Sequence, residues 1–142
     1  MITGSLAWSP LLALQRATHH TLDLLGARLA GLGLTPAELN VLATLGDGQP
    51  RTVSQLADDV GSRATTMTSV LDRLARRELI TRQQHPSSRR SVVIALTASG
   101  ASAAETVRTA VAELESALLK ELSPVQLAGL RAGLEQLGGR PG

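Results

Sequence analysis

Three short motifs mark helix starts in this sequence. The segments TPAE at 35–38, TVSQ at 52–55 and SPVQ at 123–126 each place a hydroxyl residue three positions before Glu or Gln. In this capping-box pattern the two side chains bond to backbone N–H groups that a helix start leaves unpaired. Pro36 and Pro124 add the fixed backbone angle that suits the first helical position. The motifs therefore predict helices over 36–46, 53–60 and 124–137.

Evenly spaced apolar residues predict two further long helices. In the helix expected over residues 8–31 they recur in steps of three or four, which places them on one helix face. A similar stripe follows Thr97, which is placed to cap a helix beginning there. The first stripe consists of Leu11, Leu14, Thr18, Leu22, Leu25, Leu29 and Leu32, and the second of Val107, Val111, Leu114 and Leu118. A small central domain cannot cover stripes of this length, so they predict packing against a second copy of the chain.

The middle of the chain predicts one more helix and two strands. Gly61 closes the helix over 53–60, and Ser62 is placed to cap the next helix, which runs to about Arg77. Alternating residues then predict strands near 79–84 and 91–96, joined by a loop that carries Arg89 and Arg90.

Three helices followed by a two-stranded ribbon is the order of a winged helix-turn-helix. The predicted fold class is therefore mainly α with a small β-ribbon, a winged helix-turn-helix flanked by N- and C-terminal dimerisation helices. We expect the N-terminal dimerisation helix in residues 1–34, the DNA-binding domain in 35–97 and the C-terminal dimerisation helices in 98–142.

Composition argues against several classes of function. The 142 residues include no Cys, which removes disulfides, thiolate chemistry and Cys-based zinc sites. No G-x-S-x-G, phosphate-cradling glycine loop or H-E-x-x-H motif occurs, so we expect neither an enzyme nor a bound cofactor. His19, His20 and Asp23 are better explained as ordinary polar residues of a long helix than as a metal site. No signal peptide or membrane-length apolar run is seen, which fits a cytoplasmic protein without a membrane partner.

The charge is unevenly distributed along the chain. Residues 51–90 hold eight arginines against four acids, a net charge of +4, while the remainder carries −2. A basic centre of this kind favours a polyanionic partner. The helix over 62–77 turns Met67, Val70, Leu71 and Leu74 to one side, and its opposite face is rich in small hydroxyls. Such a face fits the DNA major groove, because short side chains allow close approach and helix N-termini attract phosphate. The predicted contacts from this helix are Ser62, Arg63, Thr65, Thr66, Thr68 and Ser69.

The two arginines of the ribbon loop complete this interpretation. A ribbon beside a groove-binding helix brings its tip to the neighbouring backbone or minor groove, where guanidinium groups are favoured. Arg89 and Arg90 are therefore predicted DNA contacts. The plainer alternatives are that the hydroxyl face is merely solvated and that the arginines keep a hairpin tip soluble.

A second stripe on the first helix suggests a small-molecule site. It combines the only aromatic residue, Trp8, with Leu12, Gln15 and the titratable His19. An apolar wall with few polar groups is typical of ligand pockets. Packing at a dimer interface explains the same residues equally well.

Taken together, these features resemble the MarR family of bacterial transcription regulators. The resemblance is carried by "LTPAELNVLATL" at 34–45, "TSVLDRLARRELITR" at 68–82 and "HPSSRRSVVIALTASG" at 85–100. It implies a homodimer whose terminal helices interlock, with one helix of each chain in a major groove. It also implies a repressor released by a phenolic or lipophilic effector bound between the dimer helices and the winged helix. By position, Arg90 matches the family's minor-groove wing arginine and Arg73 the arginine of its recognition helix.

Three positions depart from the family pattern. Ser88 stands where the family usually has an Asp that holds the wing, so either the wing is looser or Asp72 serves instead. Ser69 replaces a frequent Arg or Lys, which removes one contact to DNA. Glu78 replaces the Gly that usually ends the recognition helix, and we expect a differently shaped helix end there.

The sequence thus predicts a sequence-specific DNA-binding transcription regulator. We expect a ligand-responsive repressor that binds a pseudo-palindromic operator in double-stranded DNA as a homodimer. The alternatives are a winged-helix module for protein–protein interaction, or a small-molecule-binding protein without DNA activity. The basic cluster and hydroxyl face argue against the first, and salt-sensitive duplex binding would exclude the second.

Overall fold

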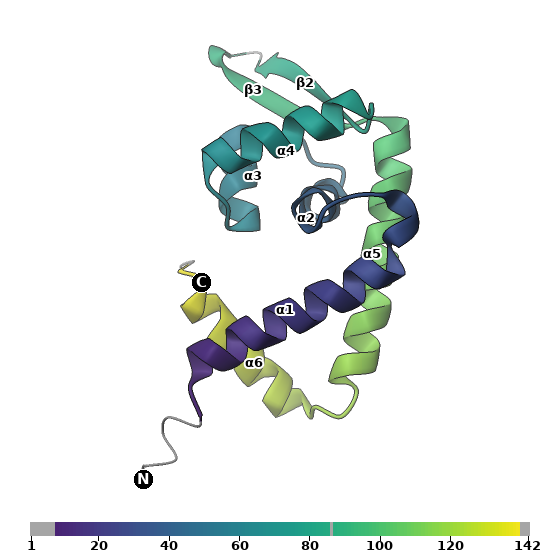
Figure 1. The fold of residues 1–142 in the computed structure, drawn as a ribbon. Helices are drawn as coiled ribbons and strands as arrows, with labels where there is room; N and C mark the ends of the chain where they lie inside the picture. The colour runs from purple at the N-terminus through teal and green to yellow at the C-terminus, as the bar shows by residue number, and fades with distance from the viewer. Residues whose placement is uncertain (1–7, 86, 140–142) are drawn as a thin grey trace.

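A computed structural model of the protein describes residues 8–85 and 87–139; the side chains at 85 and 88–90 are not described. The chain is mainly helical with a small sheet, as predicted (Figure 1). The helices are α1 (Pro10–Arg28), the 3-10 helix η2 (Ala30–Leu32), α2 (Pro36–Leu45), α3 (Val53–Val60), α4 (Ala64–Arg76), α5 (Ala98–Leu119) and α6 (Pro124–Leu137). The strands are β1 (Arg51–Thr52), β2 (Ile80–His85) and β3 (Ser88–Leu96).

The predicted helix starts are confirmed at four positions. Thr35, Thr52 and Ser123 each form both bonds of a capping box, and Thr97 accepts a hydrogen bond from the N–H of Gly100. The prediction for Ser62 was wrong. Arg63 is the N-cap of α4, and the Ser62 hydroxyl instead donates to the Arg63 carbonyl at 3.4 Å.

The sheet has three antiparallel strands in the order β1-β3-β2. Thr81 pairs with Ala95 and Gln84 with Val92, so β2 and β3 form the long ribbon of the wing. β1 adds only the pairs of Arg51 with Ile94 and of Thr52 with Val93. This short strand, which the sequence did not reveal, ties the segment before α3 to the base of the wing.

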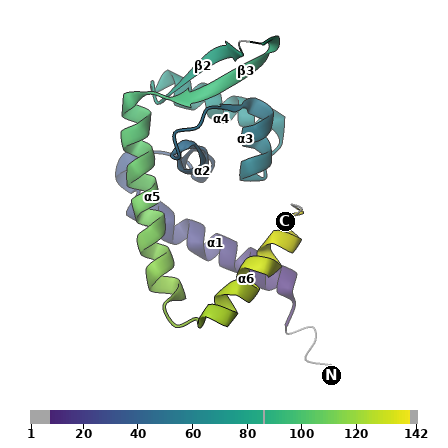
Figure 2. The same ribbon diagram turned by 180° about the vertical axis from the view of Figure 1, so that it is seen from behind.

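One hydrophobic core holds the winged helix-turn-helix together. It is built from aliphatic residues and one Met of α2, α3, α4 and the two longer strands, with Ala104 closing it from α5. A second cluster joins α1 to α2 and α5 through Leu29, Leu39, Val107 and Ala110. The long helix α5 therefore runs from the winged helix past the C-terminal end of α1, and it connects the winged helix to α6 (Figures 1 and 2).

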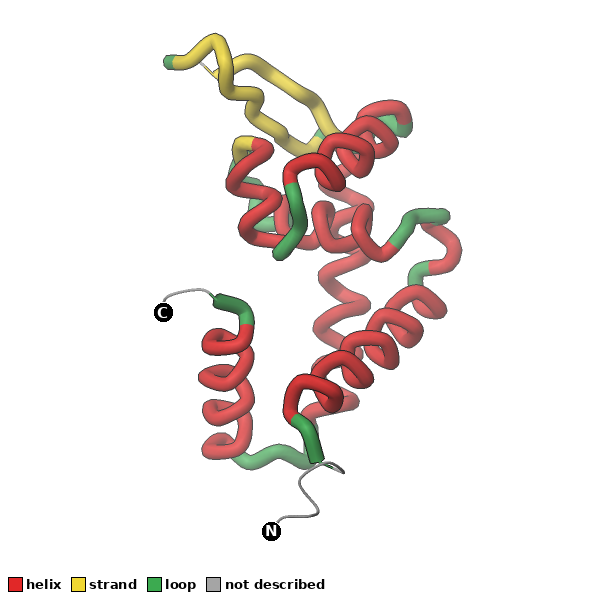
Figure 3. Tube along the Cα trace, turned by 60° about the vertical axis from the view of Figure 1, so that its left-hand side comes forward, coloured by secondary structure: helices red, strands yellow, loops and turns green. Residues whose placement is uncertain are grey.

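The two outer helices cover little of the rest of the chain. Neither α1 nor α6 has a buried residue within the described part. Toward its N-terminal end α1 runs away from the winged helix, whereas α6 turns back from the far end of α5 toward it (Figure 3). The large exposed hydrophobic side chains on these helices, together with Trp8 just before α1, are Trp8, Leu11, Leu12, Val125, Leu127, Leu130, Leu134 and Leu137. None of the described helices has both the length and the apolar character needed to cross a membrane.

The end of α4 keeps the shape that a glycine would give. Glu78 has φ of +60°, the one positive value at a non-glycine residue in the described chain. The N–H of Leu79 donates to the carbonyl of Leu74, as in the usual left-handed helix termination. The expectation of a different helix end was therefore wrong, since Glu78 adopts the left-handed conformation despite its Cβ.

Candidate nucleic-acid interface

Helix α4 presents one apolar and one polar face, as the helical spacing predicts. Met67, Val70, Leu71 and Leu74 are buried in the core of the winged helix. The opposite face is exposed over the first two turns, where the side chains are Thr65, Thr66, Thr68 and Ser69. The structure therefore brings these four predicted contacts together on one open surface, with the exposed Arg63 at its edge.

The first turn of α4 differs from that of the other α-helices. α1, α2, α3, α5 and α6 each have a side-chain cap, from Ser9, Thr35, Thr52, Thr97 and Ser123. The Arg63 side chain makes no capping hydrogen bond to α4 in the described structure. The first backbone N–H groups of α4 thus remain available to an external acceptor, and the helix dipole favours an anion there.

Two hydroxyls on the exposed face bond back to their own helix. Thr68 Oγ1 donates to the Ala64 carbonyl at 3.1 Å, and Ser69 Oγ donates to the Thr66 carbonyl at 3.0 Å. With the protons used in this way, both oxygens offer lone pairs outward, and Thr68 also presents its methyl group. Such a surface suits amino groups of bases and thymine methyl groups.

The wing stands next to α4, at the end of the molecule opposite α6 (Figure 1). Asp72 of α4 accepts a bond from Arg82 Nη1 of β2 at 2.7 Å, so the recognition helix and the wing are joined directly. Asp72 is thus ion-paired to the wing, which is the role expected of it if it replaces the Asp that the family usually has at position 88. The backbone of Arg89 and Arg90 belongs to β3, but their side chains lie outside the described part.

A network around Arg51 fixes the base of the wing. Its guanidinium donates to both carboxylate oxygens of Asp47, at 3.0 and 2.7 Å, to Asp59 at 2.9 Å, and to the carbonyls of Thr44 and Gln49. The hydrogen bond from Arg51 is the main reason that the pKa of Asp47 falls to about 2. Sequence analysis missed this network, because its groups come from α2, α3 and the loop before β1.

Arg73, which the resemblance assigned to DNA, contacts another part of the protein. Its Nε lies 2.6 Å from Oε2 of Glu38, whose side chain is only 5% exposed. Burial opposes ionisation of Glu38, but the N–H of Thr35 and the Arg73 guanidinium outweigh it and keep the pKa of Glu38 below its usual value. Arg73 is thus held against α2 rather than extended from the hydroxyl face.

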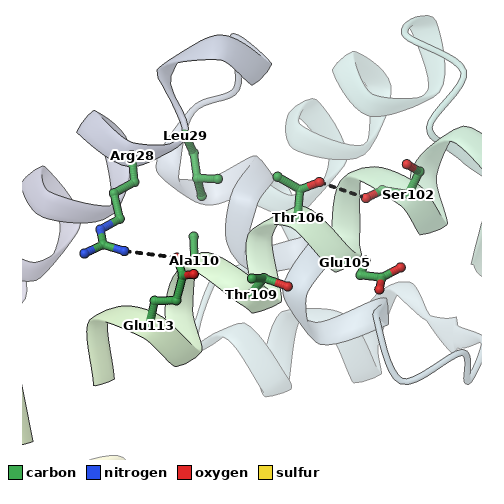
Figure 4. Close-up of a pocket in the computed structure, with 8 residues that line it drawn as sticks. All are labelled: Arg28, Leu29, Ser102, Glu105, Thr106, Thr109, Ala110 and Glu113. Atoms are coloured by element: carbon green, nitrogen blue, oxygen red, sulfur yellow. Dashed lines mark hydrogen bonds and ion pairs between the residues drawn. The ribbon is translucent and has the colours of Figure 1, made fainter. Parts of the chain in front are cut away.

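The predicted ligand residues lie on or just before α1 and form no enclosed site. Leu12, Gln15 and His19 are exposed on α1, and Trp8, which precedes the helix, is 68% exposed. An open hollow of about 610 Å³ lies instead between the C-terminal end of α1 and α5 (Figure 4). Its walls are mainly polar, and Arg28 and Glu113 form a 3.1 Å ion pair at one side. None of the four predicted ligand residues lines this hollow. In the described residues no three His, Asp or Glu side chains could share a metal ion.

Comparison with known proteins gives consistent matches. The sequence model of the MarR family matches residues 34–92. The HTH-type transcriptional repressor MdtR of Bacillus subtilis (strain 168) is 33% identical over 107 residues, which are 73% of this chain and 69% of that protein. A probable transcriptional regulator from Pseudomonas aeruginosa has a TM-score of 0.79 and 29% identity, covering 93% of this chain and 98% of its own. A mutant of MarR from E. coli, solved in complex with operator DNA, has a TM-score of 0.75 and 26% identity, covering 96% of this chain and 98% of its own.

Proposed function

This chain belongs to the MarR family, and on that premise we propose that it is a DNA-binding transcription repressor. It binds double-stranded operator DNA as a homodimer and places one α4 in the major groove of each half-site. As a DNA-binding regulator it acts in the cytoplasm, by binding and not by catalysis. The observation that carries this proposal is the surface of α4, where an uncapped helix start and an exposed hydroxyl face lie beside the wing.

The dimer is supported by the apolar surface of the outer helices. Val125 is 82% exposed and Leu12 is 58% exposed, and further leucines follow along both helices. Contiguous apolar patches of this kind usually mark an interface in a soluble protein. Sedimentation at micromolar concentration should give the mass of a dimer. A monomer at that concentration would remove the basis for two half-sites.

Sequence-specific binding can be tested without knowing the operator. Selection from a random duplex pool should recover a pseudo-palindromic sequence, and fluorescence anisotropy should show that its affinity falls steeply with salt. Thr66→Asp places a carboxylate on the exposed face of α4, where phosphate repels it although the helix dipole tolerates it. We expect this variant to lose operator binding while staying folded. Thr106→Asp, on the exposed face of α5, is the matched control and should bind normally.

We also propose that a small lipophilic or phenolic effector weakens DNA binding by contacting α1 near Trp8 and His19. The support is the exposed Trp8 and Leu12 beside two polar side chains, a surface that a dimer partner can close over. Coupling requires that the effector bind the two dimer arrangements unequally. Because Trp8 is the only Trp, its emission should change with compounds that release DNA. Unchanged emission, together with unchanged potency in Trp8→Ala, would place the effector elsewhere.

A further inference from the structure

The C-terminal half of α4 is fastened to the link that joins α1 to α2. Arg77 Nη1 donates to the Gly33 carbonyl at 3.0 Å, and Nη2 donates to the Leu32 carbonyl at 2.8 Å. One turn earlier, Arg73 Nε donates to Glu38 at 2.6 Å. Two guanidinium groups therefore hold α4 on the segment 32–38, while its N-terminal half presents the hydroxyl face.

A single carboxylate orders two helices at once. Oε1 of Glu38 accepts from the N–H of Thr35 at 2.8 Å and so completes the capping box of α2. Oε2 accepts a hydrogen bond from Nε of the Arg73 guanidinium. Because the Glu38 side chain is almost fully buried, turning Arg73 outward to DNA would leave that carboxylate without its cation, which is strongly unfavourable. Arg73 is better suited to hold α4 in place than to contact a phosphate.

The contact made by Arg77 depends on its planar, forked group. Gly33 ends η2 with φ of +63°, and the Leu32 and Gly33 carbonyls both accept from the fork. The end of a helix favours a cation, and the two parallel donors of a guanidinium fix both its distance and its orientation. A point charge such as an ammonium would not fix the same two carbonyls equally well.

The fastened segment continues directly into the N-terminal helix. Leu29 is both the C-cap of α1 and the N-cap of η2, so no free linker separates them. α1 is in turn bonded to α5 through the Arg28–Glu113 ion pair. A shift of α1 against the winged helix must therefore move the carbonyls that Arg77 holds, and with them the end of α4 (Figure 1).

From these contacts we propose that Arg73 and Arg77 are positioning residues that set the orientation of α4 and transmit to it the movement of α1. This inference rests on the proposed function, since the oriented helix is the one that enters the operator. Neither arginine need touch DNA. Their effect is on how well the hydroxyl face fits specific base pairs, and not on the charge that attracts any duplex.

The test compares Arg77→Gln and Glu38→Gln with Arg76→Gln. Arg76 lies on the last turn of α4, is exposed and makes no hydrogen bond or ion pair among the described residues, so its variant removes the same charge without breaking the fastening. Duplex binding is measured on the selected operator and on random duplex across a salt series. We expect the first two variants to lose roughly 2- to 30-fold in operator affinity, the range typical of coupling residues. The random-duplex affinity and salt slope of Arg77→Gln should equal those of Arg76→Gln, which removes the same charge. Glu38→Gln keeps every arginine, so its salt slope should equal that of the unmodified protein.

The results distinguish a positioning role of Arg73 and Arg77 from a direct contact of these arginines with DNA. A salt slope reduced by about one per chain in Arg77→Gln, relative to Arg76→Gln, would show a phosphate contact and overturn the proposal. Equal operator affinity in all three variants would also overturn it. Arg73→Lys, which keeps the charge opposite Glu38, should recover part of the specificity lost in Arg73→Gln; no recovery counts against the ion pair.

A second measurement is independent of DNA. Amide hydrogen exchange in the unmodified dimer and in Arg77→Gln should differ at residues 32–38 and 74–79, where the variant exchanges faster, but not in α3. Arg76→Gln should show no such change, and unchanged exchange in Arg77→Gln would overturn the proposed fastening. If the unmodified protein prefers no duplex over another, the proposed function fails, whereas the exchange result still decides whether the two arginines hold α4.

Discussion

Replacing Gly100 by Ala should destabilise the protein, although the same change usually stabilises a helix. Gly100 is buried in the first turn of α5, where that helix meets the start of β2. A Cβ built there would collide with the carbonyl group of Leu79, lying 2.8 Å from its carbon atom. Because the obstacle is backbone, it cannot swing aside as a flexible side chain would, so α5 or β2 must move.

The size of the effect follows from the contacts at that junction. Thr97 N donates to the Leu79 carbonyl at 3.1 Å, and Thr97 Oγ1 donates to the Glu78 carbonyl at 2.7 Å. Losing these two bonds costs about 1 kcal/mol each, and the strain of an added methyl group costs about 1–3 kcal/mol. Against this, the helix propensity of Ala returns up to about 1 kcal/mol. The net loss in the free energy of unfolding is then about 2–4 kcal/mol per chain.

Urea unfolding at one fixed protomer concentration measures this difference, since the stability of a dimer depends on concentration. Ser99→Ala is the matched control, because Ser99 is the exposed neighbour of Gly100 in the same turn. Its unfolding free energy should stay within about 0.5 kcal/mol of the unmodified protein. If Gly100→Ala is as stable as the unmodified protein or more so, the close packing of α5 on β2 is refuted.

Four other changes have definite expected outcomes. Glu78→Gly should raise the free energy of unfolding by about 0.5–1 kcal/mol in the same urea assay, because it relieves a positive φ at a residue with a Cβ. Asp47 has a folded pKa of about 2, below its ordinary 3.8, so its contribution to stability is full above about pH 4 and is lost as pH falls toward 2; Asp47→Asn should flatten stability over that window in acid titrations. Arg90→Ala should cost about 1–3 kcal/mol of operator binding per chain and weaken the preference for A·T-rich flanks. By contrast, Arg89→Ala should lower the salt slope by about one per chain on all sequences, as titration of both variants on A·T- and G·C-rich duplexes will show.

The helix boundaries were predictable because capping is a local signal. Thr35, Thr52, Thr97 and Ser123 bond to groups three residues away, so a short stretch of sequence contains both partners. The buried face of α4 was likewise predictable from helical spacing. The misplaced cap at Ser62 has the opposite cause, since a Ser before a helix can bond elsewhere, and here its hydroxyl donates to the next carbonyl.

The features that the sequence did not reveal all depend on distant partners. β1 has two residues, too few for any periodic pattern, and exists through its pairing with β3. Arg73 was assigned to DNA by position alone, whereas its carboxylate partner lies 35 residues earlier in the chain. The left-handed backbone at Glu78 is set by the packing of α4 onto β2, so the residue type there suggested a different helix end. Long-range contacts of this kind decide which arginines of a basic cluster are free for DNA.

The most direct test of the account is to map where α4 and the wing lie on the operator. The chain has no cysteine, so Thr66→Cys on α4 and Ser87→Cys on the wing each give a single attachment point for an iron–EDTA cleavage reagent. Lys120→Cys, at the far end of α5, serves as the control. The account predicts that the α4 reagent cuts two clusters about 10 base pairs apart, one in the major groove of each half-site. The wing reagent should cut the adjoining minor groove, and the control should cut neither. Diffuse cutting from Thr66→Cys that matches the control would contradict the placement of α4 in the groove.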